Sequence, residues 1–153
     1  MKTTIERLLD FKNVARSYFQ KDRKNEQSKI GYAIKKTEKR IDKAVQPYQD
    51  LIDDFNAKIE DNNIDLCEAD SKGVPVYDII KDANGKETRH YRFTKDNMKK
   101  KNDKIREIKA RFKEEEEKIL QQEVDFEPYL SNFVPDDFSD EEKIVFSGIV
   151  IPE

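Results

Sequence analysis

The residues of this chain with the widest chemical range are its single histidine and single cysteine. His90 could act as a general base or a metal ligand, and Cys67 could act as a nucleophile or a second ligand. A zinc site built from them would also need Asp65 or Asp78, and zinc sites show closer ligand spacing and more sulfur or imidazole ligands. A cysteine on a strand is most often a small buried apolar residue. We therefore predict no catalytic residue, no metal and no cofactor.

A run of carboxylates is the second chemical feature, formed by Asp61, Asp65, Glu68 and Asp70. A calcium loop would alternate oxygen ligands around a central glycine and close on a bidentate glutamate, and this order is absent. Paired carboxylates for hydrolysis stay an open alternative, because such pairs need not be close in the sequence. We interpret the run as a solvated acidic edge.

A third group of residues combines positive charge with aromatic rings. Cations beside stacking rings could hold phosphate and a base, which predicts a surface for a nucleotide-like ligand or for a partner. The lysines at 99–101 suggest nucleic acid, but the net charge of −3 weakens phosphate attraction, and we expect no nucleic-acid partner. The candidate ligand or partner surface comprises Tyr77, Arg89, His90, Tyr91, Arg92, Phe93 and Lys95.

Composition favours long thin helices over a large round core. The 153 residues are 35% apolar and 41% charged, a balance used by helices with narrow apolar stripes and also by disordered chains. The 10% aromatic content and the regular apolar repeats favour a folded chain. The length predicts one domain, or one elongated unit with a small appendage.

The distribution of apolar residues and the single cysteine predict a cytoplasmic protein. No apolar stretch approaches the ~18 residues that cross a bilayer, so we expect no membrane association. The first ten residues lack the apolar core of a secretory signal. A lone cysteine cannot form an internal disulfide, which fits a reducing compartment.

Two long polar helices joined by a β-meander are the elements that would position these residues. We predict the helices at about 26–61 and 95–123, and along each of them apolar residues recur at intervals of seven. This period is typical of helices that pack along a narrow seam. The seam residues are Ile34, Ile41, Tyr48 and Phe55 on the first helix and Met98, Ile105, Phe112 and Ile119 on the second.

Charge predicts how the two helices pair. Each helix is basic in its first part and acidic in its last part, so an antiparallel hairpin sets basic against acidic at both ends. In that register Phe55 meets Met98, and Ile34 meets Ile119. Pro47 interrupts the first helix, and either a kink or a break there fits the pattern.

Shorter elements complete the expected domain at 1–125. An amphipathic N-terminal helix is predicted at about 3–22, and a polar run to residue 27 separates it from the hairpin. The turn sequences DSKG and DANG predict a three-stranded meander, with strands at about 64–69, 74–81 and 87–93. The fold class is thus mainly α with a small β-meander (α+β), as an antiparallel helical hairpin or coiled coil with a three-stranded tip.

The last segment, 126–153, is acidic and rich in aromatic residues. Ser139 and Glu142 fit a capping box, which predicts a short helix at 140–147. So apolar a tail is expected to pack on the helices or to add a strand, in its own chain or in a neighbour. The residues expected to dock the tail are Phe133, Phe138, Phe146, Ile149 and Ile151.

Two resemblances add to these expectations. The helix–meander–helix plan over 28–122 is similar to the prefoldin architecture, without a shared sequence motif. The stretches DLCEADSKG, YRFTKD and FSDEEKIVFSGIVIPE resemble small uncharacterised proteins of tailed phages and prophages. The second resemblance implies a phage accessory protein made in the cytoplasm of a bacterial host.

The sequence therefore predicts a non-enzymatic protein-interaction protein, such as a phage assembly factor or an inhibitor of a host defence protein. A protein partner and a homo-oligomer are expected, because the seam is thin and the N-terminal helix and the tail need cover. Two alternatives stay open, an oligomeric protein that sequesters a small ligand or nucleotide and a purely structural oligomer.

Overall fold

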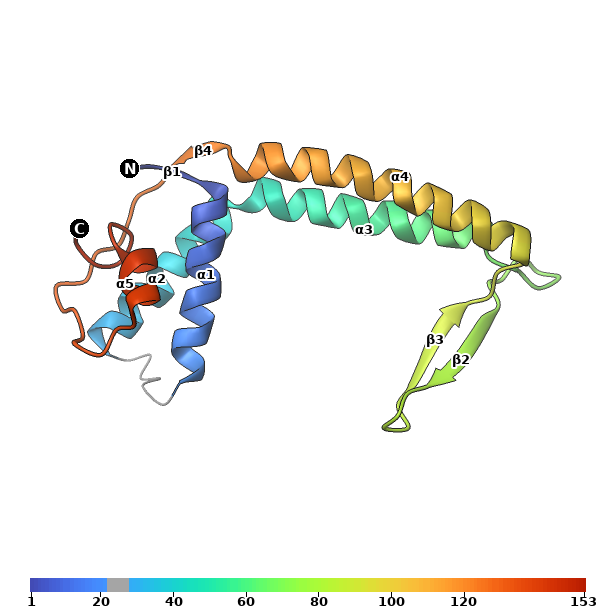
Figure 1. Ribbon diagram of the computed structural model, residues 1–153, viewed down its shortest axis with the longest axis horizontal. Coiled ribbons are helices and arrows are strands. Elements are labelled where there is room, and N and C mark those ends of the chain that lie inside the picture. The colour runs from blue at the N-terminus through green and yellow to red at the C-terminus, as the bar shows by residue number, and fades with distance from the viewer. Residues whose placement is uncertain (22–27) are drawn as a thin grey trace. The chain divides into compact units, whose positions relative to one another are not determined.

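The computed structural model describes residues 1–21 and 28–153, which form two compact units (Figure 1). Unit 1 contains Met1–Asp50 and Glu116–Glu153, and unit 2 contains Leu51–Glu115. The described residues are mainly helical and have two small antiparallel sheets of two strands each. This confirms the predicted class, mainly α with a little β, but not its finer features. The predicted division at residue 125 differs from these units, because the C-terminal segment belongs to the same unit as the N-terminal helix.

Unit 1 is built around two helices with well-formed N-terminal caps. Helix α1 (Ile5–Gln20) begins after Thr4, whose hydroxyl accepts the backbone N–H of Arg7 at 3.2 Å. Helix α2 (Lys29–Ala44) begins after Ser28, whose hydroxyl accepts the backbone N–H of Gly31 at 3.0 Å. Such caps satisfy backbone donors that a helix start leaves free. The predicted end of the first helix at 22 and the predicted start of the next at 26 lie outside the described residues.

The core of unit 1 lies between these helices and the C-terminal segment. Apolar residues at helical spacing on α1 and α2 face it, as their periodicity requires. The described core residues include Ile5, Leu8, Phe11, Ala15 and Tyr18 from α1, Ile30, Ala33, Ile34 and Ile41 from α2, and Phe126, Phe138, Phe146, Ile149 and Val150 from the C-terminal segment.

A small sheet joins the two chain segments that make up unit 1. Strand β1 (Lys2–Thr4) pairs antiparallel with β4 (Glu123–Asp125), in a register that sets Thr3 opposite Val124. Neither strand was predicted, since the predicted helices were to begin at about 3 and to end at about 123, and α4 ends at Leu120. Three-residue strands carry too little periodicity to be recognised without their partner.

Helix α5 (Asp140–Phe146) confirms the predicted capping box. The Ser139 hydroxyl accepts the N–H of Glu142 at 3.1 Å, and the Glu142 carboxylate accepts the N–H of Ser139 at 3.2 Å. The helix packs on α1 in the same chain, where the rings of Phe146 and Phe11 are 5.1 Å apart. The C-terminal segment therefore packs in its own chain and covers α1.

Thr37 supplies a prediction about unit 1. Its side chain is fully buried, and its hydroxyl has no hydrogen-bond partner among the described residues. Thr37→Val keeps the shape and removes the unpaired hydroxyl, so we expect the free energy of unfolding of unit 1 to rise by about 1 kcal/mol in urea denaturation. The matched control is Thr88→Val, at an exposed threonine of unit 2, which should leave unit 1 unchanged. A loss of stability in T37V would show that the hydroxyl is paired.

The long helix predicted at 26–61 is two helices. Helix α2 ends at Ala44, and α3 (Gln46–Leu66) starts after Val45. Pro47 lies in the first turn of α3, where its missing N–H removes no helical hydrogen bond. Of the two alternatives at Pro47, the structure has the break.

Unit 2 contains most of α3 and of α4 (Lys95–Leu120), which run side by side (Figure 1). The predicted register is wrong by two heptads, since Phe55 meets Phe112 instead of Met98, with ring centroids 4.5 Å apart. A heptad pattern leaves the register free by whole repeats. The charge pattern indicated the wrong register because the basic residues of α2 belong to unit 1 and do not pair with α4 in unit 2.

A two-stranded ribbon of β2 (Tyr77–Lys81) and β3 (Glu87–Tyr91) completes unit 2. The first of the three predicted strands, at 64–69, is wrong, since α3 continues to Leu66. The residues after α3 contribute an isolated bridge between Ala69 and Pro75 and backbone hydrogen bonds of Glu68 to Arg92 and Val76, without forming a strand. The sequence around 64–69 is too short for its period to separate strand from helix.

The two predicted turns are confirmed and share one geometry. In each turn an aspartate, Asp70 or Asp82, accepts two backbone N–H groups, all at 2.9 Å, from residues two and four positions later. Gly73 and Gly85 have φ of 78° and 79°, a conformation that side chains with a Cβ rarely adopt. These turns fix where the chain reverses on either side of β2.

None of the helices within residues 1–21 and 28–153 combines the length and the apolar content that spanning a membrane requires.

Candidate functional site

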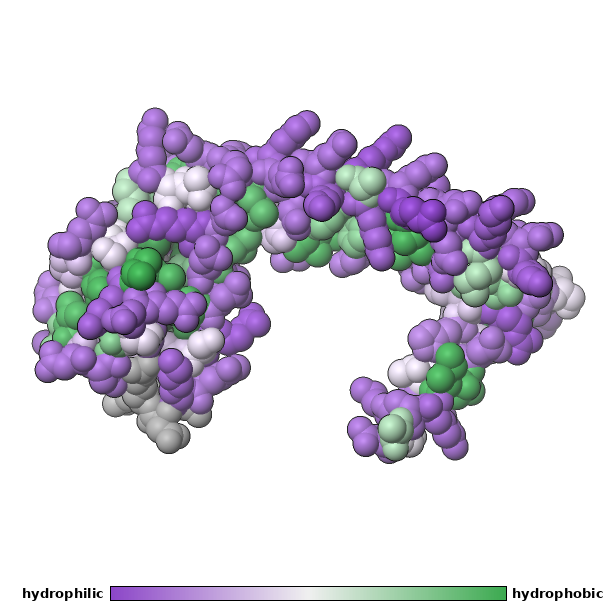
Figure 2. Space-filling model, viewed as in Figure 1, coloured by the Kyte–Doolittle hydropathy of each residue, from purple (hydrophilic) through white to green (hydrophobic). Residues whose placement is uncertain are grey.

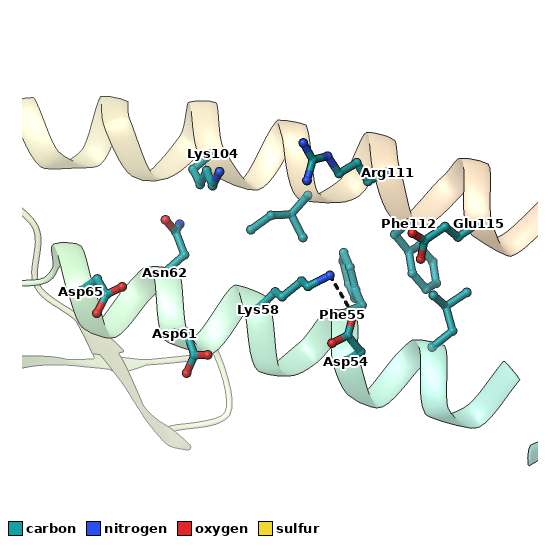
Figure 3. A pocket seen from close by; sticks show the side chains of 12 residues that line it. Asp54, Phe55, Lys58, Asp61, Asn62, Asp65, Lys104, Arg111, Phe112 and Glu115 are labelled. Carbon is teal, nitrogen blue, oxygen red and sulfur yellow. Dashed lines mark ion pairs between the residues drawn. The ribbon is translucent and has the colours of Figure 1, made fainter. Parts of the chain in front are cut away.

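A groove runs along one side of the α3–α4 hairpin within unit 2 (Figure 3). Its volume is about 330 Å³. Four apolar residues form its floor, Leu51 and Phe55 from α3 and Ile108 and Phe112 from α4. On α3 the lining residues recur every three or four positions, so they form a single stripe along one face of the helix.

Only a few side-chain contacts bridge α3 and α4, and the groove is the space that they leave open. The aromatic pair of Phe55 and Phe112 bridges the two helices, and the Asn62 side chain donates to the Lys101 carbonyl at 3.4 Å. In α3 only Leu51 is buried, and the described residues of α4 include no buried side chain. Figure 2 shows apolar surface along the hairpin among polar side chains.

Charged side chains form the two rims of the groove. The α3 rim has Asp54, Lys58, Asp61 and Asp65, and the α4 rim has Lys104, Arg111 and Glu115 (Figure 3). Three acids and one base give the α3 rim a net charge of −2, and two bases and one acid give the α4 rim +1. The rims therefore carry opposite net charge.

Ion pairs along each helix neutralise part of the rims. Lys58 binds Asp54 at 2.9 Å, and this hydrogen bond is the main reason that the pKa of Lys58 is raised. Lys104 binds Glu107 at 3.3 Å. Within the described residues, Asp61 and Asp65 take part in no salt bridge, so their charge is available to an incoming group.

The predicted ligand surface on the ribbon is divided between two faces. Tyr77 and Tyr91 stack on one face with centroids 5.0 Å apart, and the Arg89 guanidinium lies 5.9 Å from the Tyr77 ring. His90 and Arg92 alternate with them and lie on the other face, since successive side chains of a strand point to opposite faces. The seven residues therefore do not converge on one point.

Most of these residues already have partners within the chain. Arg92 binds Asp78 at 2.8 Å, which raises its pKa. The Tyr91 hydroxyl donates to the Glu60 carboxylate, and this hydrogen bond raises the pKa of Tyr91.

The last two residues of the predicted surface lie where the ribbon meets α4. The Lys101 ammonium lies 4.8 Å from the Phe93 ring, and Lys95 is the first residue of α4. Whether any part of this surface binds a ligand stays a prediction.

The two residues with the widest chemical range are each engaged locally. His90 Nε2 lies 3.1 Å from the Thr88 hydroxyl, and the Cys67 thiol lies 3.4 Å from the Ile64 carbonyl. Over the described residues, no three histidine, cysteine or acidic side chains come together as a metal site would require.

Comparison with family models, with curated proteins and with solved structures finds no match to this chain. The resemblances to phage proteins and to the prefoldin plan therefore stay predictions, and the geometry carries the argument on function.

The residues predicted to dock the C-terminal segment divide into two groups. Phe138, Phe146, Ile149 and Ile151 are buried in unit 1. Phe133 is 54% exposed, so the prediction that it docks the tail is wrong within this chain. The Ser131 hydroxyl accepts the Phe133 N–H at 3.1 Å and thus forms a local turn at this position.

The groove itself was not predicted from the sequence. The sequence placed Phe55 and Phe112 in the narrow seam between the helices, and it placed Asp61 and Asp65 in a solvated acidic edge. A signal was present, since Leu51, Asp54, Phe55 and Lys58 follow one another at helical spacing with charges flanking the apolar positions. Only the observed register shows that these residues face the same side as Ile108 and Arg111.

Proposed function

We propose that this chain is a non-enzymatic protein-interaction protein, and that the groove of unit 2 binds an amphipathic helix of another polypeptide. The main support for this proposal is the aromatic pair of Phe55 and Phe112, which lies on the floor of the groove. The hairpin around this pair has hardly any buried side chain. Burial of apolar surface is the main favourable term in both folding and association. A hairpin with so little of its own apolar surface buried gains stability when another helix covers the groove.

The shape and chemistry of the groove support a helix as the occupant. An apolar floor flanked by charged rims matches an amphipathic helix, which anchors itself through apolar residues at i, i+3, i+4 and i+7. The lining residues include no serine, threonine, cysteine, histidine or tyrosine. Of the carboxylates and lysines that could act as acid, base or nucleophile, Asp54 and Lys58 bind each other and Lys104 binds Glu107. Both points favour binding over chemistry.

The resemblance to tailed-phage proteins extends this proposal to a biological role. In a bacterial cytoplasm, such a protein would act as an assembly factor for phage components or as an inhibitor of a host defence protein. Both roles need a surface that covers an apolar helix of a partner.

Site-specific photocrosslinking tests the proposed function. A benzophenone amino acid replaces Ile108 in the groove of the full chain, which is expressed in bacterial cells and irradiated. We expect a discrete covalent adduct with a polypeptide, because the side chain at this position lies on the floor that the partner covers.

Two matched controls make the result specific. The same probe at Arg106, on the opposite side of α4 and exposed, should give no such adduct. The probe at Ile144, which is 74% exposed on unit 1, tests for capture by any apolar surface. Absence of an adduct at position 108, or equal adducts at all three positions, would contradict the proposal.

A further inference from the structure

We infer that the polypeptide covering the groove is a second copy of the same hairpin, placed so that α3 of each copy lies against α4 of the other. This inference rests on the proposed function and names its partner. It differs from the oligomer expected from the sequence, which was to cover the N-terminal helix and the tail. Those elements cover each other within unit 1.

Segregation of charge between the two rims is the first argument. The α3 rim has a net charge of −2 and the α4 rim +1. Two hairpins facing each other across their grooves can form a four-helix arrangement with a two-fold axis. If the axis runs along the helices, each acidic rim meets a basic rim. If the axis runs across them, acid meets acid and base meets base.

The positions of the charges along the helices give the second argument. Two contacts give the levels of the residues, the Phe55 and Phe112 rings with centroids 4.5 Å apart and the Asn62 side chain 3.4 Å from the Lys101 carbonyl. The helices run in opposite directions with the same rise per residue, so counting from these contacts makes Lys104 level with residues 59–63 of α3, around Asp61. A two-fold axis along the helices keeps these levels, so each copy sets its Lys104 close to Asp61 of the other.

The same count places a second attractive pair. Counting from the same two contacts makes Arg111 level with residues 52–56 of α3, around Asp54. In the second copy, Asp54 would lie against Arg111, while the floors of the two grooves cover each other. Both copies contribute the same surface, so the interface closes as a dimer.

Charge reversal in the full chain tests this arrangement. Light scattering after size exclusion should give wild type twice the 18.1 kDa of one chain. Asp61→Lys with Asp65→Lys sets positive against positive and should weaken the dimer by at least roughly 100-fold. Lys104→Glu with Arg111→Glu sets negative against negative and should do the same. The two variants mixed together, and all four changes in one chain, should restore the dimer.

The design separates the arrangement from unfolding and from general charge effects. If mixing the α3-rim variant with the α4-rim variant restores the dimer, both variants are folded. Arg106→Glu with Lys113→Glu reverses two charges on the far side of α4, and this control should remain a dimer. A dimer that survives reversal of the α3 rim would overturn the inference. It would indicate that α3 faces α3 of the other copy, an arrangement in which like charges meet both before and after the reversal.

Failure of this inference and failure of the proposed function have different signatures. A wild-type monomer at every concentration, together with an adduct of the probe at position 108 to a different protein, would overturn the second copy as the partner. A monomer without any adduct would overturn both.

Discussion

Phe146→Ala is expected to lower the free energy of unfolding of unit 1 by about 3–5 kcal/mol, the cost of removing a fully buried phenylalanine. Phe146 is 0% exposed, and its ring lies 5.1 Å from Phe11 and 5.4 Å from Phe138. Its loss removes these ring contacts and a third one with Tyr18 at 6.3 Å, and it leaves a cavity between α1 and the C-terminal segment. Urea denaturation, followed by circular dichroism, measures the change.

The same helix offers a control for this substitution. Ile144 is 74% exposed, so Ile144→Ala should change the free energy of unfolding by no more than about 0.5 kcal/mol. If F146A and I144A had equal effects, the packing of α5 on α1 described above would be wrong.

Phe112→Ala is expected to destabilise unit 2 by about 2 kcal/mol and to leave unit 1 unchanged. The phenylalanine is only half-buried, so its loss costs less than that of a core residue, but it also removes the aromatic pair with Phe55. Native-state hydrogen exchange measures the two units separately, because each amide reports the opening of its own region. Amides of residues 51–66 and 95–115 should lose protection, and those of α1 should keep it.

Lys113→Ala is the matched control, since Lys113 is the exposed neighbour of Phe112 on α4. It should leave the exchange of both units unchanged. Equal loss of protection in α1 and α3 of F112A would show that the units unfold together, contrary to their division at residues 50 and 116.

Local signals in the sequence predicted local structure well. The capping box at Ser139 and Glu142 and the turns at Gly73 and Gly85 depend on residues within a few positions of one another, and all of them are present. The apolar repeats also placed Phe55 and Phe112 on facing sides of two paired helices, and their rings are in contact.

Features that depend on distant residues were not predictable in the same way. Ile34 and Ile41 fit the heptad pattern of the hairpin, yet they are buried in unit 1, because α2 and α3 separate at Val45. Strands β1 and β4 are each three residues long and pair across more than a hundred residues. The groove needs the register of α3 against α4, and a repeat of seven leaves that register undetermined by whole heptads.

The discontinuity of unit 1 has a consequence for synthesis on the ribosome. Helix α1 must wait for α5, which is completed on the order of ten seconds later at typical rates of elongation. Unit 2 is contiguous in the chain and can fold during this interval. Its folding shortens the loop that unit 1 must close, and the entropic cost of closure falls with loop length. Until then the part of the α1 face that α5 covers stays exposed, so nascent chains should need protection from aggregation before the last thirty residues emerge.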